Sequence, residues 1–224
     1  MMLYLFPFLA IVIGAVIGLT LKDKYNLKIK LLLSFSGAFL LAITLFELLP
    51  QVYNQLNAKL TGILIMAGIV LQLVLESFSK GAEHGHIHVE KQQKTFPWLL
   101  FISLCIHSIL EGFPIDDHND MVYGIIIHKI PIAILVSAYL VQSGFKNFSY
   151  ITFITLFAVM TPFGTYLSQE ASFLSNYIHY INAIVIGIFF HIATVILFES
   201  SHGHKFNNTK LVSILLGVLV AYFI

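Results

Sequence analysis

The sequence contains no arginine, a single cysteine and few charged residues of either sign. Charged residues make up 10% of the 224 residues, hydrophobic residues make up 58%, and the formal net charge is +1. Because Cys105 is alone, neither an intramolecular disulfide nor a cysteine-based zinc cluster can form. The near-neutral charge and the lack of a basic stretch exclude nucleic acid as a partner. A soluble domain is about a quarter charged, so we expect the lipid bilayer to be the solvent of this chain.

Long apolar runs take up most of the chain, and a helical span needs about 20 such residues. Eight segments qualify, with the last one short: Leu3 to Leu21, Ile29 to Leu49, Leu60 to Phe78, Phe96 to Ile115, Met121 to Val141, Phe148 to Leu167, Ile178 to Glu199 and Lys210 to Ile224. The sequence therefore predicts an all-α polytopic membrane protein, with residues 1–224 forming one transmembrane domain. The first segment lacks a charged leader and a small-residue cleavage site, so it is interpreted as a retained span and not as a signal peptide.

The lysines predict the orientation, because connections on the inner side of a membrane carry an excess of positive charge. With the N-terminus outside, 10 of the 12 lysines fall in inner connections, leaving Lys59 outside and Lys129 within a span. Both termini are therefore expected outside.

Two polar segments on the predicted inner side are rich in histidine. The loop 79–95 is expected to be flexible and carries His84, His86 and His88, while His202 and His204 follow the seventh span. Such segments bind metal weakly by composition alone, although an ordinary linker with incidental histidines is the alternative. On the outer side, an acidic turn between spans four and five contains Asp116, Asp117 and Asp120.

A faint internal repeat occurs at an offset of 150 residues. The matches are Gly14 with Gly164, Gly37 with Gly187, Phe39 with Phe189, and Thr44 with Thr194. Spans one to three would then correspond to spans six to eight, in a 3+2+3 arrangement of inverted repeats like those of many transporters. Four matches are few, so chance is the competing explanation.

Several ionisable side chains fall within or near the ends of the predicted spans, where a charge costs about 2.5 to 3.5 kcal/mol. They are Glu47, His107, Glu111, His128, Lys129, His191 and Glu199. Glu76 is within a turn of a span end, where its carboxylate can reach the interface, so no function is assigned to it.

The fourth and fifth spans are the most informative pair. His107 and Glu111 are four residues apart, so they project from one helix face. At 1.5 Å per residue, His107 lies roughly 12 Å and His128 roughly 10 Å below the turn that joins the two spans. Two imidazoles and a carboxylate at matched depth predict a site for a divalent metal. The alternative is that each histidine only forms hydrogen bonds between helices.

Lys129 is unusual beside metal ligands because its charge repels a cation. Either its ammonium pairs with Glu111 and takes the place of a second metal ion, or it points elsewhere and pairs with another acid such as Glu47. Glu47 and His191 are candidates for a transport path, with structural hydrogen bonding as the alternative for each.

The motif His107-Ser108-Ile109-Leu110-Glu111-Gly112 resembles the fourth-span signature His-Ser-x-x-Glu-Gly of the ZIP (Zrt/Irt-like) family of divalent-metal transporters. His128-Lys129-Ile130-Pro131 resembles the fifth-span element of that family, and Glu47-Leu48-Leu49-Pro50 stands where the family often has His-x-x-Pro. The stretch Gly187 to Glu199 resembles its seventh span. The predicted eight spans, outer termini and histidine-rich inner loop also match the layout of the family.

This resemblance implies uptake of a divalent metal, typically zinc, into the cytoplasm by alternating access. His107, Glu111 and His128 would be the ligands, with Ser108 as a further oxygen ligand. Relatives with two metals have a glutamate where this chain has Ile132, so one bound metal is expected. Iron, manganese or cadmium could replace zinc as the transported ion, and no catalytic cofactor is expected. The family also implies a homodimer, and the absence of a targeting segment favours a bacterial inner membrane.

Two other functional classes remain open. An intramembrane metalloenzyme would use the same ligands to activate water, but the sequence has neither His-Glu-x-x-His nor a second carboxylate beside His107. A metal sensor that does not transport would bind the ion without moving it. Only a measurement of flux separates these classes from a transporter.

Overall fold

A computed structural model describes residues 1–20, 27–79, 96–145, 147–199 and 208–224. These residues form helices without a β-strand. The helices are α1 (Met2–Thr20), α2 (Leu27–Ile43), α3 (Leu49–Gln55), α4 (Ala58–Ser79), α5 (Trp98–Gly112), α6 (Met121–Gln142), α7 (Asn147–Glu170), α8 (Ile178–Glu199) and α9 (Asn208–Phe223). A π-helical turn, Thr44–Leu48, joins α2 to α3, and a 3₁₀ turn, Ser172–Tyr177, precedes α8. The loop histidines His84, His86, His88, His202 and His204 lie outside the described residues.

All eight predicted spans appear as helical segments, although two are shorter than a span requires. Six helical segments of the described chain are long and apolar enough to cross a membrane. The other two are α5, with 15 residues, and α9, with 16 residues. At 1.5 Å per residue these helices are about 23 Å long, against an apolar thickness of about 30 Å.

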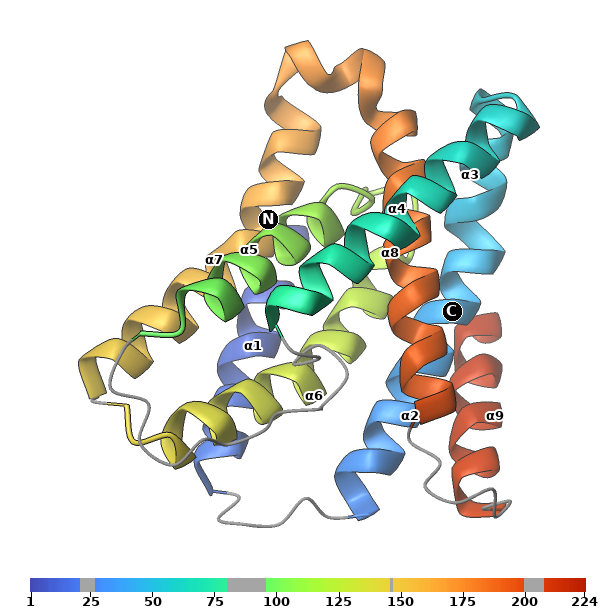
Figure 1. The fold of residues 1–224 in the computed structure, drawn as a ribbon. Helices are drawn as coiled ribbons and strands as arrows, with labels where there is room; N and C mark the ends of the chain where they lie inside the picture. The colour runs from blue at the N-terminus through green and yellow to red at the C-terminus, as the bar shows by residue number, and fades with distance from the viewer. Residues whose placement is uncertain (21–26, 80–95, 146, 200–207) are drawn as a thin grey trace.

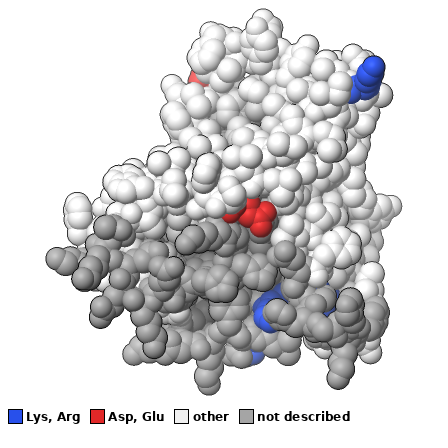
Figure 2. Space-filling view, in the orientation of Figure 1, with Lys and Arg blue, Asp and Glu red and all other residues white. Residues whose placement is uncertain are grey.

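The outer surface of the bundle is apolar, as lipid contact requires. Large side chains such as Ile13, Val16, Ile63 and Met66 are at least half exposed along α1 and α4. On the face that Figure 2 draws, the described surface is uncharged apart from small acidic spots and a few lysines. A soluble monomer rarely exposes apolar patches of this extent.

The helices pack as two sets (Figure 1). In the first set, α6 packs on α1, α5 packs on α7, and α1 contacts α7. In the second set, α2 packs on α9, α4 packs on α8, and α2 contacts α8. The main contacts between the sets are those of α2 with α6 and of α4 with α5. Both helices that carry the predicted metal ligands, α5 and α6, therefore belong to the first set and face the second.

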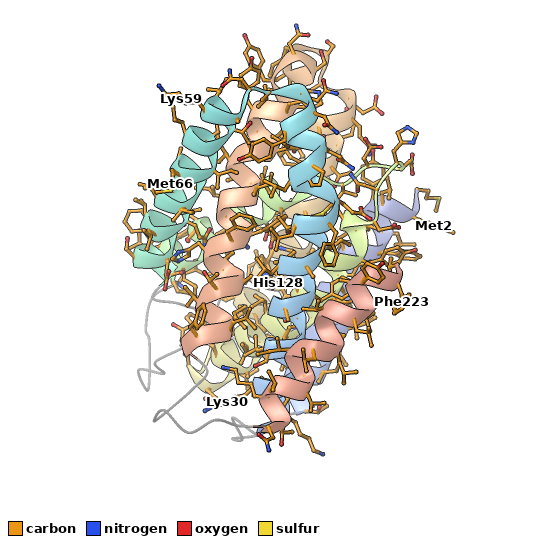
Figure 3. The ribbon with its side chains drawn as sticks, turned by 90° about the vertical axis from the view of Figure 1, so that its right-hand side faces the viewer. Met2, Lys30, Lys59, Met66, His128 and Phe223 are labelled. Carbon is orange, nitrogen blue, oxygen red and sulfur yellow. The ribbon has the colours of Figure 1, made fainter. Side chains whose placement is uncertain are left out.

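Two apolar clusters fill the interior, one above the other. One cluster contains Leu104, Ile132 and Phe153, and the other contains Phe39, Ile125 and Phe189. Because α6 contributes Ile125 to one cluster and Ile132 to the other, His128 lies between them. Figure 3 shows His128 inside the bundle, between the ends that Lys59 and Lys30 mark.

Candidate metal centre

The fold brings His107 and Glu111 of α5 together with His128 of α6. One ligand atom of each residue lies within 4.8 Å of the ligand atoms of the other two. Among the described residues, these three side chains are therefore close enough to hold one metal ion together. The side chains are almost completely buried, with exposures of 3% for His107, 0% for Glu111 and 1% for His128. Buried ionisable groups in a membrane protein mark a functional site by default, because lipid and apolar side chains make them costly.

Both imidazoles approach the same carboxylate oxygen. Nε2 of His107 lies 2.8 Å from Oε1 of Glu111, and Nε2 of His128 lies 3.5 Å from that atom. Tetrahedral zinc with bonds of about 2.0–2.1 Å places its ligand atoms about 3.3 Å apart. These two distances lie on either side of this value, and the two histidine ligand atoms lie within 4.8 Å of each other, so the three side chains must draw together to bind one ion.

Lys129 occupies the other side of the carboxylate. Its ammonium forms an ion pair with Oε2 of Glu111 and donates a hydrogen bond of 2.7 Å to Oγ of Ser108. The ammonium also lies 5.0 Å from the ring centroid of Phe157 on α7, within range of a cation–π interaction. Of the two pairings considered for Lys129, the structure shows the one with Glu111. The predicted role of Ser108 as a metal ligand stays a prediction, since its hydroxyl oxygen accepts a hydrogen bond from the Lys129 ammonium here.

Glycines allow the neighbouring helices to pack closely on the two ligand-bearing helices. A Cβ atom at Gly164 of α7 would lie 1.9 Å from the carbonyl oxygen of Ile109 on α5. A Cβ atom at Gly14 of α1 would lie 2.6 Å from the carbonyl oxygen of Ile130 on α6. Gly14 and Gly164, which match each other in the internal repeat, thus each allow a neighbouring helix to pack closely on one of the two helices that carry the motifs. The inverted-repeat arrangement itself stays a prediction.

Glu47 is not part of the ligand group. Its Oε2 atom accepts a hydrogen bond of 2.8 Å from the backbone N–H of Asp120, the residue that precedes α6. Glu47 therefore satisfies a backbone donor at the start of α6 and links the π turn after α2 to the connection between α5 and α6.

His191 forms a partly buried pair that is separate from the ligand group. Its Nε2 atom on α8 is 2.6 Å from Oε2 of Glu76 on α4. The sequence analysis assigned no function to Glu76 because it is near a span end. The signal it missed is that Glu76 lies four residues after Gln72, a polar residue in the middle of the same span. Glu199 ends α8, and its side chain lies outside the described part of the chain.

Asp116 and Asp117 line a cavity at the end of the bundle where α5 ends and α6 begins. The cavity has a volume of about 680 Å³, and the end of α3, the α5–α6 turn and the start of α8 contribute to its wall. Its other polar residues include His118, His179 and Asn182. The turn is ordered locally, since Oδ1 of Asp116 accepts a hydrogen bond of 3.1 Å from the backbone N–H of His118.

The apolar helices and the buried trio define an integral membrane protein with a candidate divalent-metal centre. A sequence profile described as ZIP Zinc transporter matches residues 79–224, which is more than half of the chain. Zinc transporter ZIP1 of Danio rerio is 33% identical over 87 residues, covering 36% of this chain and 29% of that protein. The matched stretch thus spans about three tenths of the length of this relative. The chain belongs to the ZIP zinc transporter family, as its motifs predict, and this is a family of transporters and not of enzymes.

Proposed function

We propose that this protein moves a divalent metal ion, with zinc as the first candidate, across the membrane by alternating access. The observation that supports the proposal is the convergence of His107, Glu111 and His128 at one buried point of an apolar bundle. The motif helices that carry these residues fall within the stretch that matches the family profile.

The chemistry of the three side chains suits an ion that must be released. Two neutral imidazoles and one carboxylate bind first-row divalent ions, while the thiolates of a closed structural zinc site are lacking in this trio. Transport needs binding that is strong enough to replace the hydration of the ion and weak enough to release it. Lys129 weakens the binding further, because the Glu111 charge is already balanced before the ion arrives.

The same lysine supports a single bound ion. Its ammonium lies against Oε2 of Glu111 and Oγ of Ser108, where a second cation would need these oxygens. Ile132, one turn after His128, offers no ligand atom.

The two helix sets give the proposal a physical route. The ion would enter through the acidic cavity, bind between α5 and α6, and leave past Glu76 and His191 when the first set moves against the second. The lysine distribution makes the cavity the outer end, so the movement would be uptake. The proposal includes a homodimer in a bacterial inner membrane, with the histidine loops accepting the released ion.

Zinc influx into proteoliposomes that contain a trapped fluorescent indicator tests the proposal. Wild type, His107→Ala and Glu111→Ala are compared at matched reconstitution, with Glu170→Ala as the control because Glu170 is an exposed carboxylate at the end of α7 that does not line the cavity. Saturable influx that only the two site substitutions abolish is the expected result. If zinc, iron, manganese and cadmium all fail to enter faster than into empty liposomes, the protein is not an uptake transporter. Tight metal binding without influx would instead favour a sensor, and metal-dependent hydrolysis would favour an enzyme.

A further inference from the structure

Gln72 is the most deeply buried amide of the described chain for which the fold provides no hydrogen bond. Its side chain is 0% exposed, and neither Oε1 nor Nε2 has a partner among the described residues. Buried amides almost always form hydrogen bonds, and an unsatisfied one is retained only for a reason.

Gln72 lies in the stripe of α4 that faces the interior. The buried residues of α4 are spaced three, four or seven apart, which places them on one helix face: Thr61, Gly68, Gln72, Leu75 and Ser79. Gly68 packs against the backbone of α8 at Ile184, and the carbonyl of Leu75 accepts a hydrogen bond of 2.7 Å from Ser103 of α5. Gln72, between these two contacts, points to the region where α4 meets α8 and α5.

His107 lies at the same level on the neighbouring helix. The helices α4 and α5 run side by side in opposite directions (Figure 1). From the hydrogen bond between Ser103 and Leu75, one helical turn leads to His107 on α5 and to Gln72 on α4. Nδ1 of His107 is also buried and also lacks a hydrogen-bond partner among the described residues.

We propose that Gln72 is a positioning residue for the metal ligand His107, through a hydrogen bond between its amide and Nδ1 that is made through one water or after a change of the Gln72 rotamer, because the two groups form no direct hydrogen bond in this structure. A metal-bound histidine almost always uses its second ring nitrogen in this way, which fixes the ring orientation and the tautomer. An amide suits both states of a transport cycle. Without metal, Nε2–H of His107 donates to Glu111 and the unprotonated Nδ1 accepts from the Gln72 Nε2–H. With metal on Nε2, the ring proton is on Nδ1 and is donated to Oε1 of Gln72.

This inference rests on the proposed metal site, and it adds a consequence. Gln72 belongs to the second helix set, whereas all three ligands belong to the first. The hydrogen bond therefore connects ion binding to the contact between the sets.

Zinc binding to the full-length chain in detergent micelles, measured by isothermal titration calorimetry, tests the inference. Gln72→Met keeps the side-chain volume but cannot form the hydrogen bond, and we expect zinc affinity to fall about 10- to 100-fold. Gln72→Glu keeps an acceptor for Nδ1–H, and we expect it to restore affinity to within about threefold of wild type. Gln142→Met, at an exposed glutamine at the end of α6, is the matched control and should leave the affinity unchanged.

Thermal unfolding of each metal-free variant separates positioning from packing. We expect metal-free Gln72→Met to lose no more stability than one hydrogen bond contributes, so that the fold is retained while zinc affinity falls. If Gln72→Met does not fold, Gln72→Asn withdraws the amide by one methylene and should also weaken binding. Unchanged zinc affinity in Gln72→Met, or equal losses in Gln72→Met and Gln72→Glu, would overturn the inference. Because these measurements concern binding only, the expected pattern without any zinc influx would refute transport and leave the role of Gln72 intact.

Discussion

Lys129 and Glu111 form an ion pair at the centre of the membrane domain, and it uses the carboxylate oxygen that the two imidazoles do not approach. Oε2 of Glu111 takes the ammonium, while Oε1 faces Nε2 of His107 and Nε2 of His128. The carboxylate is thus neutralised on one side and available to a metal on the other. Because the two oxygens of Glu111 have different partners, Lys129 influences the affinity of the site for metal although it is not itself a ligand.

Replacing Lys129 by methionine should tighten metal binding. The substitution removes a positive charge next to a dication in a medium of low dielectric constant, where Coulomb repulsion is strong. We expect the zinc dissociation constant to fall by at least about tenfold, which corresponds to about 1.4 kcal/mol. Calorimetry on the purified chain measures the affinity.

The same substitution should make the metal-free protein less stable. Removing one partner of a buried ion pair costs about 3–5 kcal/mol, because the other charge is left without compensation. Zinc should therefore raise the unfolding temperature of Lys129→Met by more than it raises that of wild type. Weaker zinc binding by this variant would contradict the assigned role of the lysine.

Gly164→Ala should loosen the packing of α7 on the ligand-bearing α5. The added Cβ would lie 1.9 Å from the carbonyl of Ile109, so the two helix backbones must move apart. Overpacking of this kind costs about 1–3 kcal/mol. Gly62→Ala on α4 is the control, because a Cβ there meets no atom within 4 Å. Thermal unfolding in detergent should show a loss for Gly164→Ala alone, and equal behaviour of the two variants would exclude tight packing at Gly164.

Glu47 substitutions distinguish a structural role from a place on the transport path. Because the carboxylate accepts the Asp120 N–H, Glu47→Gln keeps an acceptor and should transport zinc at nearly the wild-type rate. Glu47→Ala leaves the start of α6 without its partner, and we expect a loss of about 1 kcal/mol in stability. Influx that falls steeply in Glu47→Gln, with unchanged stability, would show that the charge itself serves transport.

Neutralising the acidic cavity should weaken the capture of the ion. In the double variant Asp116→Asn/Asp117→Asn, we expect a KM for zinc that is several-fold higher at low ionic strength, with kcat unchanged. The effect should shrink at about 0.15 M salt, where the Debye length is about 8 Å. Influx measured at two salt concentrations checks both points, and a KM change that is independent of salt would indicate direct coordination by the two aspartates.

The sequence was sufficient for the helices and for the proximity of His107, Glu111 and His128, because both depend on local patterns. Apolar runs gave the spans to within a few residues, and the four-residue spacing of His107 and Glu111 placed them on one face. His128 lies at a similar depth below the turn between the two spans, which placed it next to them. The geometry of the trio follows from these regularities and from the short turn between α5 and α6.

Contacts between distant helices could not be obtained in this way. The pairing of Glu76 with His191 joins residues 115 positions apart, and the hydrogen bond from Asp120 to Glu47 joins residues 73 positions apart. Periodicity within a helix does not determine which neighbour its face meets. The burial of Gln72 depends in the same way on α8 and α5, so its lack of a partner became visible only in the structure.

The π turn at Thr44–Leu48 has a consequence for comparing this chain with its relatives. A π turn holds one residue more than an α-helical turn, so the faces of α3 are rotated by about 100° against a continuous helix starting at α2. Relatives with an unbroken helix here should align with a gap of one residue within 44–48. Deleting one residue of this segment should restore a regular helix and turn Glu47 away from Asp120. The extra residue in the π turn therefore determines that Glu47 is the side chain that reaches Asp120.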